Sequence, residues 1–214
     1  MTCHVLNRGN GRIRIFHKPG DYEAFERVLA EGLERYAVEL LTYCLMPNHW
    51  HLVVRSNTDR ALGQWMGWVG VTHVRRYHEH YHSRGGGHLY QGRFKSFPVA
   101  EDDYFLALCR YVEGNALRAE LVARAEDWQW CGLWRRANGA EDLPMSDWPL
   151  ERPRNWVAWV NRGLDDEHVE EIRTCVQRGR PLGPDGWVQQ TAARLGLEFT
   201  LRGPGRPRLK GYNQ

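Results

Sequence analysis

The sequence predicts an α+β fold, in which an antiparallel β-sheet carries helices on one face and a C-terminal helical extension follows. Two observations support this prediction. Short apolar segments that end in turn residues alternate with longer segments whose apolar residues recur every three or four positions. Their order, β-α-β-β-α-β-α, is that of a ferredoxin-like or RRM-like sheet.

Four segments build the first half of this order. The stretch "CHVLNRGN" (3–10) is expected to be a strand that ends in turn residues. Residues 21–37 have helical apolar spacing, and Asp21 is a suitable N-cap. Residues 38–46 and 49–55 are expected to be antiparallel strands, because the Met-Pro-Asn sequence at their junction favours a turn.

The second half alternates in the same way. Residues 59–82 are expected to be helical despite their glycines, because large apolar residues recur on one side. A glycine-rich loop over 83–88 leads to a strand over 89–99. Residues 101–122 form the strongest predicted helix, and the acidic residues at its start suit the positive end of the helix dipole.

Length and composition indicate one domain with an extension, because 214 residues with 42% apolar content can bury a core. The composition changes near residue 125. We expect a domain over 1–135, a helical extension over 136–200 and a basic flexible tail over 201–214. Arginine-rich tails punctuated by glycine and proline typically meet polyanions, although a merely solvated terminus has the same composition.

The five cysteines are scattered, odd in number and contain no Cys-x-x-Cys pair. This pattern argues against a disulfide framework or a zinc knuckle and fits a reducing compartment. The sequence also shows no signal peptide and no apolar run long enough to span a membrane. We therefore expect a cytoplasmic protein that does not enter a membrane.

The stretch "MPNHWHLVV" (46–54) places two histidines inside a predicted strand. Side chains alternate between the faces of a strand, so His49 and His51 share one face, about 7 Å apart, while Trp50 faces the core. Two imidazoles that point the same way are a metal-ligand arrangement. An H-x-H sequence also arises by chance in a half-buried strand with both rings in solvent.

The predicted helix that follows supplies two further candidates. Tyr111 and Asn115 are spaced i, i+4 and project from one face. If that face packs across the histidines, an amide joins two imidazoles around a divalent ion, and a phenol can attack phosphorus. Taken alone, Tyr111 fits an ordinary core position in an amphipathic helix better than a catalytic one.

The chain resembles the single-tyrosine HUH transposases, and specifically the REP-associated tyrosine transposases. The matching stretches run in the family's order over nearly the whole chain: "NRGN" (7–10), "YCLMPNHWHLVV" (43–54), "LYQGRFKSFPV" (89–99), "RYVEGNALRAELV" (110–122), "WQWCGLW" (128–134) and "GRPLG" (179–183). The resemblance implies the HUH nuclease fold and an enzyme that nicks and joins hairpin-bearing single-stranded DNA through a 5′-phosphotyrosine intermediate.

By this resemblance, His49, His51 and Asn115 are the metal ligands and Tyr111 is the nucleophile. An N,N,O site with open positions fits Mg²⁺ or Mn²⁺ better than structural zinc. Relatives commonly continue the helix motif as Asn-Pro, whereas this chain has Ala116 after the asparagine. Without the proline, the helix is expected to run on past Asn115.

Several groups are candidates to hold DNA. Basic side chains can bind phosphates and an aromatic ring can stack an unpaired base, although each arginine alone is equally a solvated surface charge. The tail sequence "GPGRPR" resembles arms that enter the minor groove. The predicted DNA-binding residues are Arg8, Arg75, Arg76, Tyr90, Arg93, Lys95, Arg206 and Arg208.

Two other functions remain open at this point. A domesticated transposase would bind REP-like hairpins and act as a regulator without cutting DNA. A protein that only binds DNA, however, need not keep all four candidate residues. A zinc-dependent hydrolase also uses H-x-H, but it needs further acidic or histidine ligands at set spacings, and these are absent. Arg55 occupies a position where a nearby acidic ligand would be expected. A monomer is favoured, and a dimer is also compatible with the sequence.

Overall fold

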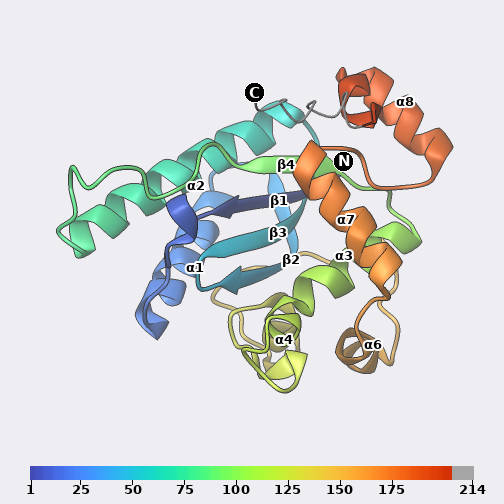
Figure 1. Cartoon of the computed structure of the whole chain (residues 1–214). Helices are drawn as coiled ribbons and strands as arrows, with labels where there is room; N and C mark the ends of the chain where they lie inside the picture. The colour runs from blue at the N-terminus through green and yellow to red at the C-terminus, as the bar shows by residue number, and fades with distance from the viewer. Residues whose placement is uncertain (204–214) are drawn as a thin grey trace, which may run out of the picture.

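The β-α-β-β-α-β order predicted from the sequence is present in the computed structural model, which describes residues 1–203 (Figure 1). The strands form one antiparallel sheet in the order β2-β3-β1-β4, as in ferredoxin-like folds. The bounds of this unit are β1 Thr2–Arg8, α1 Pro19–Leu33, β2 Val38–Met46, β3 His49–Ser56, α2 Asp59–His80 and β4 Lys95–Pro98, with a 3₁₀ turn at Asn10–Arg12.

The two faces of the sheet bury different residues, as alternation along each strand requires. On one face, Trp50 and Leu52 of β3 pack with helix residues such as Phe25 and Trp65. This face is covered by α1 and α2, so the helices of the ferredoxin-like unit lie on one side, as predicted. The other face carries Val53 and the candidate histidines.

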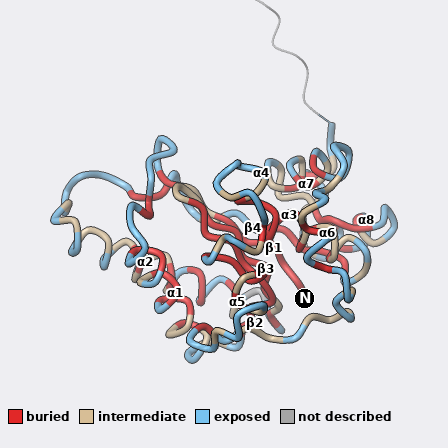
Figure 2. Tube along the Cα trace, turned by 90° about the horizontal axis from the view of Figure 1, so that it is seen from below, coloured by how far each residue is buried: buried red, intermediate tan, exposed pale blue. Residues whose placement is uncertain are grey.

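Helices that follow β4 cover part of this second face. Helix α3 (Asp103–Glu113) contacts β2 and β3, and α7 (Asp166–Arg178) contacts α3 and β4. Figure 1 shows α3 and α7 on the side of the sheet away from α2, and Figure 2 shows the buried strands between the two helical layers. The sheet is therefore covered on both faces.

Two predicted elements are shorter than expected. The strand over 89–99 reduces to β4, because residues 91–93 form bends and only an isolated bridge joins Tyr90 to Gly9. The helix over 101–122 ends at Glu113. Gly114 separates it from α4 (Asn115–Arg118), so the helix does not run on far beyond Asn115. A glycine is a poor helix former, which favours an interruption here.

The C-terminal extension is helical, as predicted, and is joined to the sheet. Leu182 forms a parallel bridge with Val99, just after β4, through hydrogen bonds to Pro98 and Ala100. Within residues 1–203, no helix is long and apolar enough to cross a membrane. The remaining elements are α5 Gly132–Asn138, α6 Trp156–Arg162, α8 Asp185–Leu195 and 3₁₀ turns at Ala125–Asp127 and Glu198–Leu201.

Candidate active site

A cavity of about 640 Å³ lies between the second face of the sheet and the helices that cover it. Its walls include His49 and His51 from β3, Tyr111 from α3 and Asn115 from α4. The structure therefore brings together the four residues that the sequence singled out for chemistry.

The ring of His49 is oriented by its neighbour. Its Nδ1 lies 2.6 Å from Oδ1 of Asn48. An amide oxygen only accepts hydrogen bonds, so Nδ1 carries the proton and Nε2 keeps its lone pair. Burial lowers the pKa of His49 to about 3, and the charges of Arg8 and Arg118 act in the same direction. The ring is neutral at physiological pH, with one nitrogen able to bind a cation.

His51 has a partner that the sequence analysis missed. His4 on β1 lies on the same face, with its Nε2 2.9 Å from Nδ1 of His51 and the two rings stacked. Burial lowers the pKa of His4 to about 3 and the pKa of His51 well below its usual value. Both rings are neutral, so one donates to the other. When Nδ1 of His51 donates, its Nε2 keeps the lone pair.

Tyr111 reaches the histidines from α3. Its ring centroid lies 6.0 Å from that of His51, and the rings are nearly perpendicular. Glu113, two residues further along, accepts hydrogen bonds from Thr42 of β2 and Trp156 of α6, each at 2.6 Å. These two bonds fix the end of α3 against the sheet, close to the point from which Tyr111 and Asn115 project.

Arg118 is a second residue that the sequence analysis missed. Its guanidinium carbon lies 4.1 Å from the centroid of the Tyr111 ring, a cation–π arrangement. Its Nη2 donates to the Tyr111 carbonyl and to Oδ1 of Asn115, both at 3.0 Å. Burial lowers the pKa of Arg118. The residue lies three positions after Asn115, and this helical spacing was the available signal.

The cavity is strongly cationic. Three predicted DNA-binding residues line it, namely Arg8, Arg93 and Lys95, and Arg118 and Arg173 join them. Arg93 precedes β4 rather than alternating with Lys95 along a strand, but both still reach the cavity. Among the described residues that line the cavity there is no aspartate or glutamate. Such a surface suits a polyanion.

Tyr90 lies elsewhere, contrary to prediction. It is 8% exposed in the core, and its hydroxyl accepts a hydrogen bond from Trp50 and lies 2.5 Å from Nδ1 of His73. A ring held in this way cannot stack an unpaired base. The sequence pattern missed this because the partners of the hydroxyl come from β3 and α2, which are distant in sequence.

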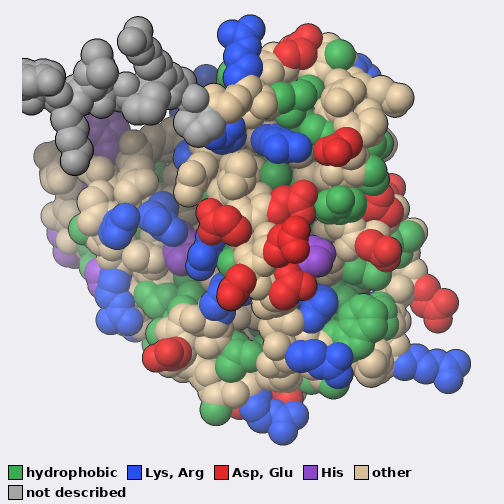
Figure 3. All heavy atoms as spheres, turned by 45° about the vertical axis from the view of Figure 1, so that its right-hand side comes forward, with side chains coloured by type: hydrophobic (Ala, Val, Ile, Leu, Met, Phe, Trp, Pro, Cys, Tyr) green, Lys and Arg blue, Asp and Glu red, His purple; other side chains and the backbone are tan. Residues whose placement is uncertain are grey.

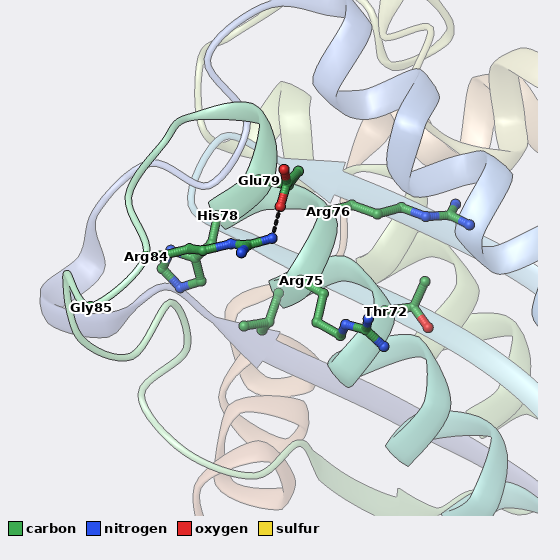
Figure 4. A pocket seen from close by; sticks show the side chains of 8 residues that line it. Thr72, Arg75, Arg76, His78, Glu79, Arg84 and Gly85 are labelled. Carbon is green, nitrogen blue, oxygen red and sulfur yellow. Dashed lines mark hydrogen bonds and ion pairs between the residues drawn. The ribbon is translucent and has the colours of Figure 1, made fainter.

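Arg75 and Arg76 also lie apart from the cavity, on α2 beyond the other face of the sheet. They line a separate surface pocket with His78 and the ion pair between Glu79 and Arg84 (Figure 4). The guanidinium of Arg76 is already paired with both oxygens of Glu31. The predicted tail residues Arg206 and Arg208 lie outside the described residues.

A model of the family described as "Transposase IS200 like" matches residues 1–115, which is more than half of the chain. The chain belongs to the IS200-like transposase family. The match ends at Asn115, so Arg118 and α7 of this IS200-like transposase lie beyond it. Among curated proteins the sequence has no match.

Solved structures resemble this IS200-like transposase in fold. A REP-associated tyrosine transposase bound to a REP hairpin aligns with a TM-score of 0.51 and 15% identity, over 70% of this chain and 85% of that one. A putative transposase from Deinococcus radiodurans aligns with a TM-score of 0.41 and 15% identity, over 48% of this chain and 82% of that one. The first of these likenesses supports the observed arrangement of sheet and helices.

The donor atoms of the site fit a divalent cation. His49 and His51 each present a nitrogen lone pair when Nδ1 carries the proton, and Oδ1 of Asn115 has a second lone pair beside its bond to Arg118. Within residues 1–203, no group of three or more His, Cys, Asp or Glu side chains is arranged to hold a metal ion. The candidate third donor is therefore the amide.

Proposed function

We propose that this IS200-like transposase is a metal-dependent single-stranded DNA endonuclease and strand transferase. The observation that carries the proposal is the convergence of Tyr111 with His49, His51 and Asn115 in one cationic cavity. A nucleophile, candidate cation donors and groups that attract phosphate are then all within one site. The proposed cofactor is Mg²⁺ or Mn²⁺.

In the proposed reaction, the Tyr111 oxygen attacks the scissile phosphorus. The bond from phosphorus to the 3′-oxygen breaks, the departing oxygen takes a proton, and the phenol proton passes to solvent. The product is a 5′-phosphotyrosine ester, and attack by a 3′-hydroxyl reverses the step to join strands. A divalent ion held by His49, His51 and Asn115 would supply Lewis-acid polarisation of the phosphate.

Arg118 supports the nucleophile in this scheme. Its guanidinium lies against the Tyr111 ring in a cation–π contact that helps to hold the ring in place. Its bond to the Tyr111 carbonyl holds the backbone at the same place. Arg118 thus acts on the orientation of the attacking group.

The proposed substrate is single-stranded DNA that bears a REP-like hairpin. The structural relative at 15% identity was solved bound to such a hairpin, and the cationic cavity suits a DNA backbone. The proposed active unit is a monomer, because one chain contributes all four candidate residues. Size-exclusion chromatography with light scattering tests this, and a stable dimer would contradict it.

A covalent-trapping gel tests the activity. Labelled hairpin DNA is incubated with the protein and Mn²⁺ or EDTA, and the products are separated in SDS. We expect a metal-dependent adduct that Tyr111→Phe abolishes. Tyr104→Phe is the matched control, because Tyr104 lies on the same helix but does not line the cavity. Tight hairpin binding without an adduct, over several hairpins, would indicate a non-catalytic binding protein instead.

A further inference from the structure

Helix α7, which belongs to the C-terminal extension, lies at the candidate site. Arg173, Val176 and Gln177 of this helix line the same cavity as Tyr111 and the histidines. The helix is held by its adjacent side, where Val169, Ile172 and other residues are buried among apolar groups of α3 and the sheet. Arg173 is therefore presented to the cavity from a well-packed support.

Two arginines in this cavity have little or no charge compensation from carboxylates. Within residues 1–203, no carboxylate forms an ion pair with Arg118. Arg173 has only Glu170, at 3.7 Å on the same helix, and its side chain is 52% exposed. Burial lowers the pKa of Arg118, and the charge of Arg173 acts in the same direction. Two cations that repel each other beside a cavity favour an anion between them.

The outer surface near the C-terminal helices has a different character. Figure 3 shows acidic side chains gathered at the centre of this face with basic side chains around them. The acidic side chains at its centre disfavour a phosphate backbone there. The outer face thus carries acidic side chains at its centre, whereas α7 adds a positive charge, that of Arg173, to the cavity wall. This difference in charge favours a role for Arg173 inside the site.

We propose that Arg118 and Arg173 form a clamp for one phosphate of the single-stranded DNA substrate beside Tyr111. The proposal rests on the proposed function and adds the C-terminal extension to the DNA-binding surface. Arg118 supplies the side of the clamp that lies against Tyr111, and Arg173 closes it from α7. Gln177, one helical turn after Arg173, lies at the same wall and can donate to the strand.

The test measures hairpin-DNA binding in EDTA as a function of salt, so it does not depend on the metal-loaded activity. A lost phosphate contact on a single strand lowers the slope of log affinity against log salt by about 0.7. We expect this change, with about 5-fold weaker binding at low salt, in Arg173→Gln. Arg178→Gln is the matched control, because Arg178 lies on the same helix outside the cavity and contacts the Arg202 carbonyl.

Arg118→Gln is expected to lower the slope similarly, and a thermal melt identifies any loss of folding. Because Arg173 is exposed, its variant keeps the test decisive even if Arg118→Gln misfolds. Equal slopes for wild type, Arg173→Gln and Arg178→Gln would overturn the clamp. Failure of the proposed function is distinguishable, since it appears as an absent Tyr111 adduct while the slope change in Arg173→Gln persists.

Discussion

The two faces of strand β3 are almost equally buried but differ in what their side chains contact. Leu52 and Trp50 are 0% and 1% exposed on the face toward α1 and α2, and His51 is 4% exposed on the face toward α3. Trp50 packs against aromatic rings, whereas His51 meets His4 and borders a cavity. The first face is therefore packed throughout against α1 and α2, whereas the second combines packed apolar residues with the candidate site.

The largest expected effect comes from the histidine face. His49→Ala should reduce the metal-dependent adduct by at least about 100-fold, because it removes a candidate metal ligand. The unfolding free energy should change by less than about 1 kcal/mol, since the ring packs against few apolar groups. Trapping gels and urea denaturation measure the two effects. Full adduct formation by a folded His49→Ala protein would remove His49 from the reaction.

The opposite face should show the reverse pattern. Trp50→Ala is expected to lower the unfolding free energy by about 3–5 kcal/mol, because a large fully buried ring is deleted and the Tyr90 hydroxyl loses its donor. Urea denaturation measures this loss. At temperatures where the variant remains folded, its metal affinity should match that of wild type. A loss below 1 kcal/mol would contradict the division between the faces.

His4→Phe sharpens the comparison within the histidine face. We expect metal affinity to fall about 10–100-fold, because His51 loses the neighbour that orients its ring and selects its tautomer. Calorimetric titration with Mn²⁺ provides the measurement. His73→Phe, which also removes a buried imidazole but on the α2 side, serves as the control and should leave metal affinity unchanged. Equal affinities in the two variants would reject the positioning role of His4.

The smallest effect concerns pH and the core face. Burial lowers the pKa of His73 to about 3, although the Asp21 carboxylate acts in the opposite direction. Its other neighbours are the Tyr90 hydroxyl and the rings of Phe25 and Tyr77. The unfolded chain binds a proton below about pH 6.5 and the folded chain does not, so stability falls as pH drops from about 6.5 toward 3.

We therefore expect His73→Gln to reduce the loss of stability between pH 7.5 and pH 5 by about 2 kcal/mol. Urea denaturation of both proteins at the two pH values gives this difference, and the contributions of the other histidines cancel. The same pH dependence in variant and wild type would mean that His73 is not held neutral in the fold.

Local sequence was sufficient for much of the fold because it encodes periodicity and turns. The β2 strand matches its predicted bounds, and alternation along β3 correctly separated Trp50 from His49 and His51. The i, i+4 spacing correctly placed Tyr111 and Asn115 on one cavity wall. The DNA-binding prediction failed at Tyr90, because the partners of its hydroxyl, Trp50 and His73, come from elements distant in sequence.

The sequence by itself therefore determined the order of elements, the faces of the central strands and the candidate chemistry of four residues. Only the tertiary structure decided which distant groups meet them. Strand pairing placed His4 beside His51, and packing of α7 on α3 and β4 brought Arg173 to the cavity. Packing also placed the Tyr90 ring in the core and paired the Arg76 guanidinium with the Glu31 carboxylate. The physical reason is that these contacts join residues far apart in the chain, where no local periodicity operates.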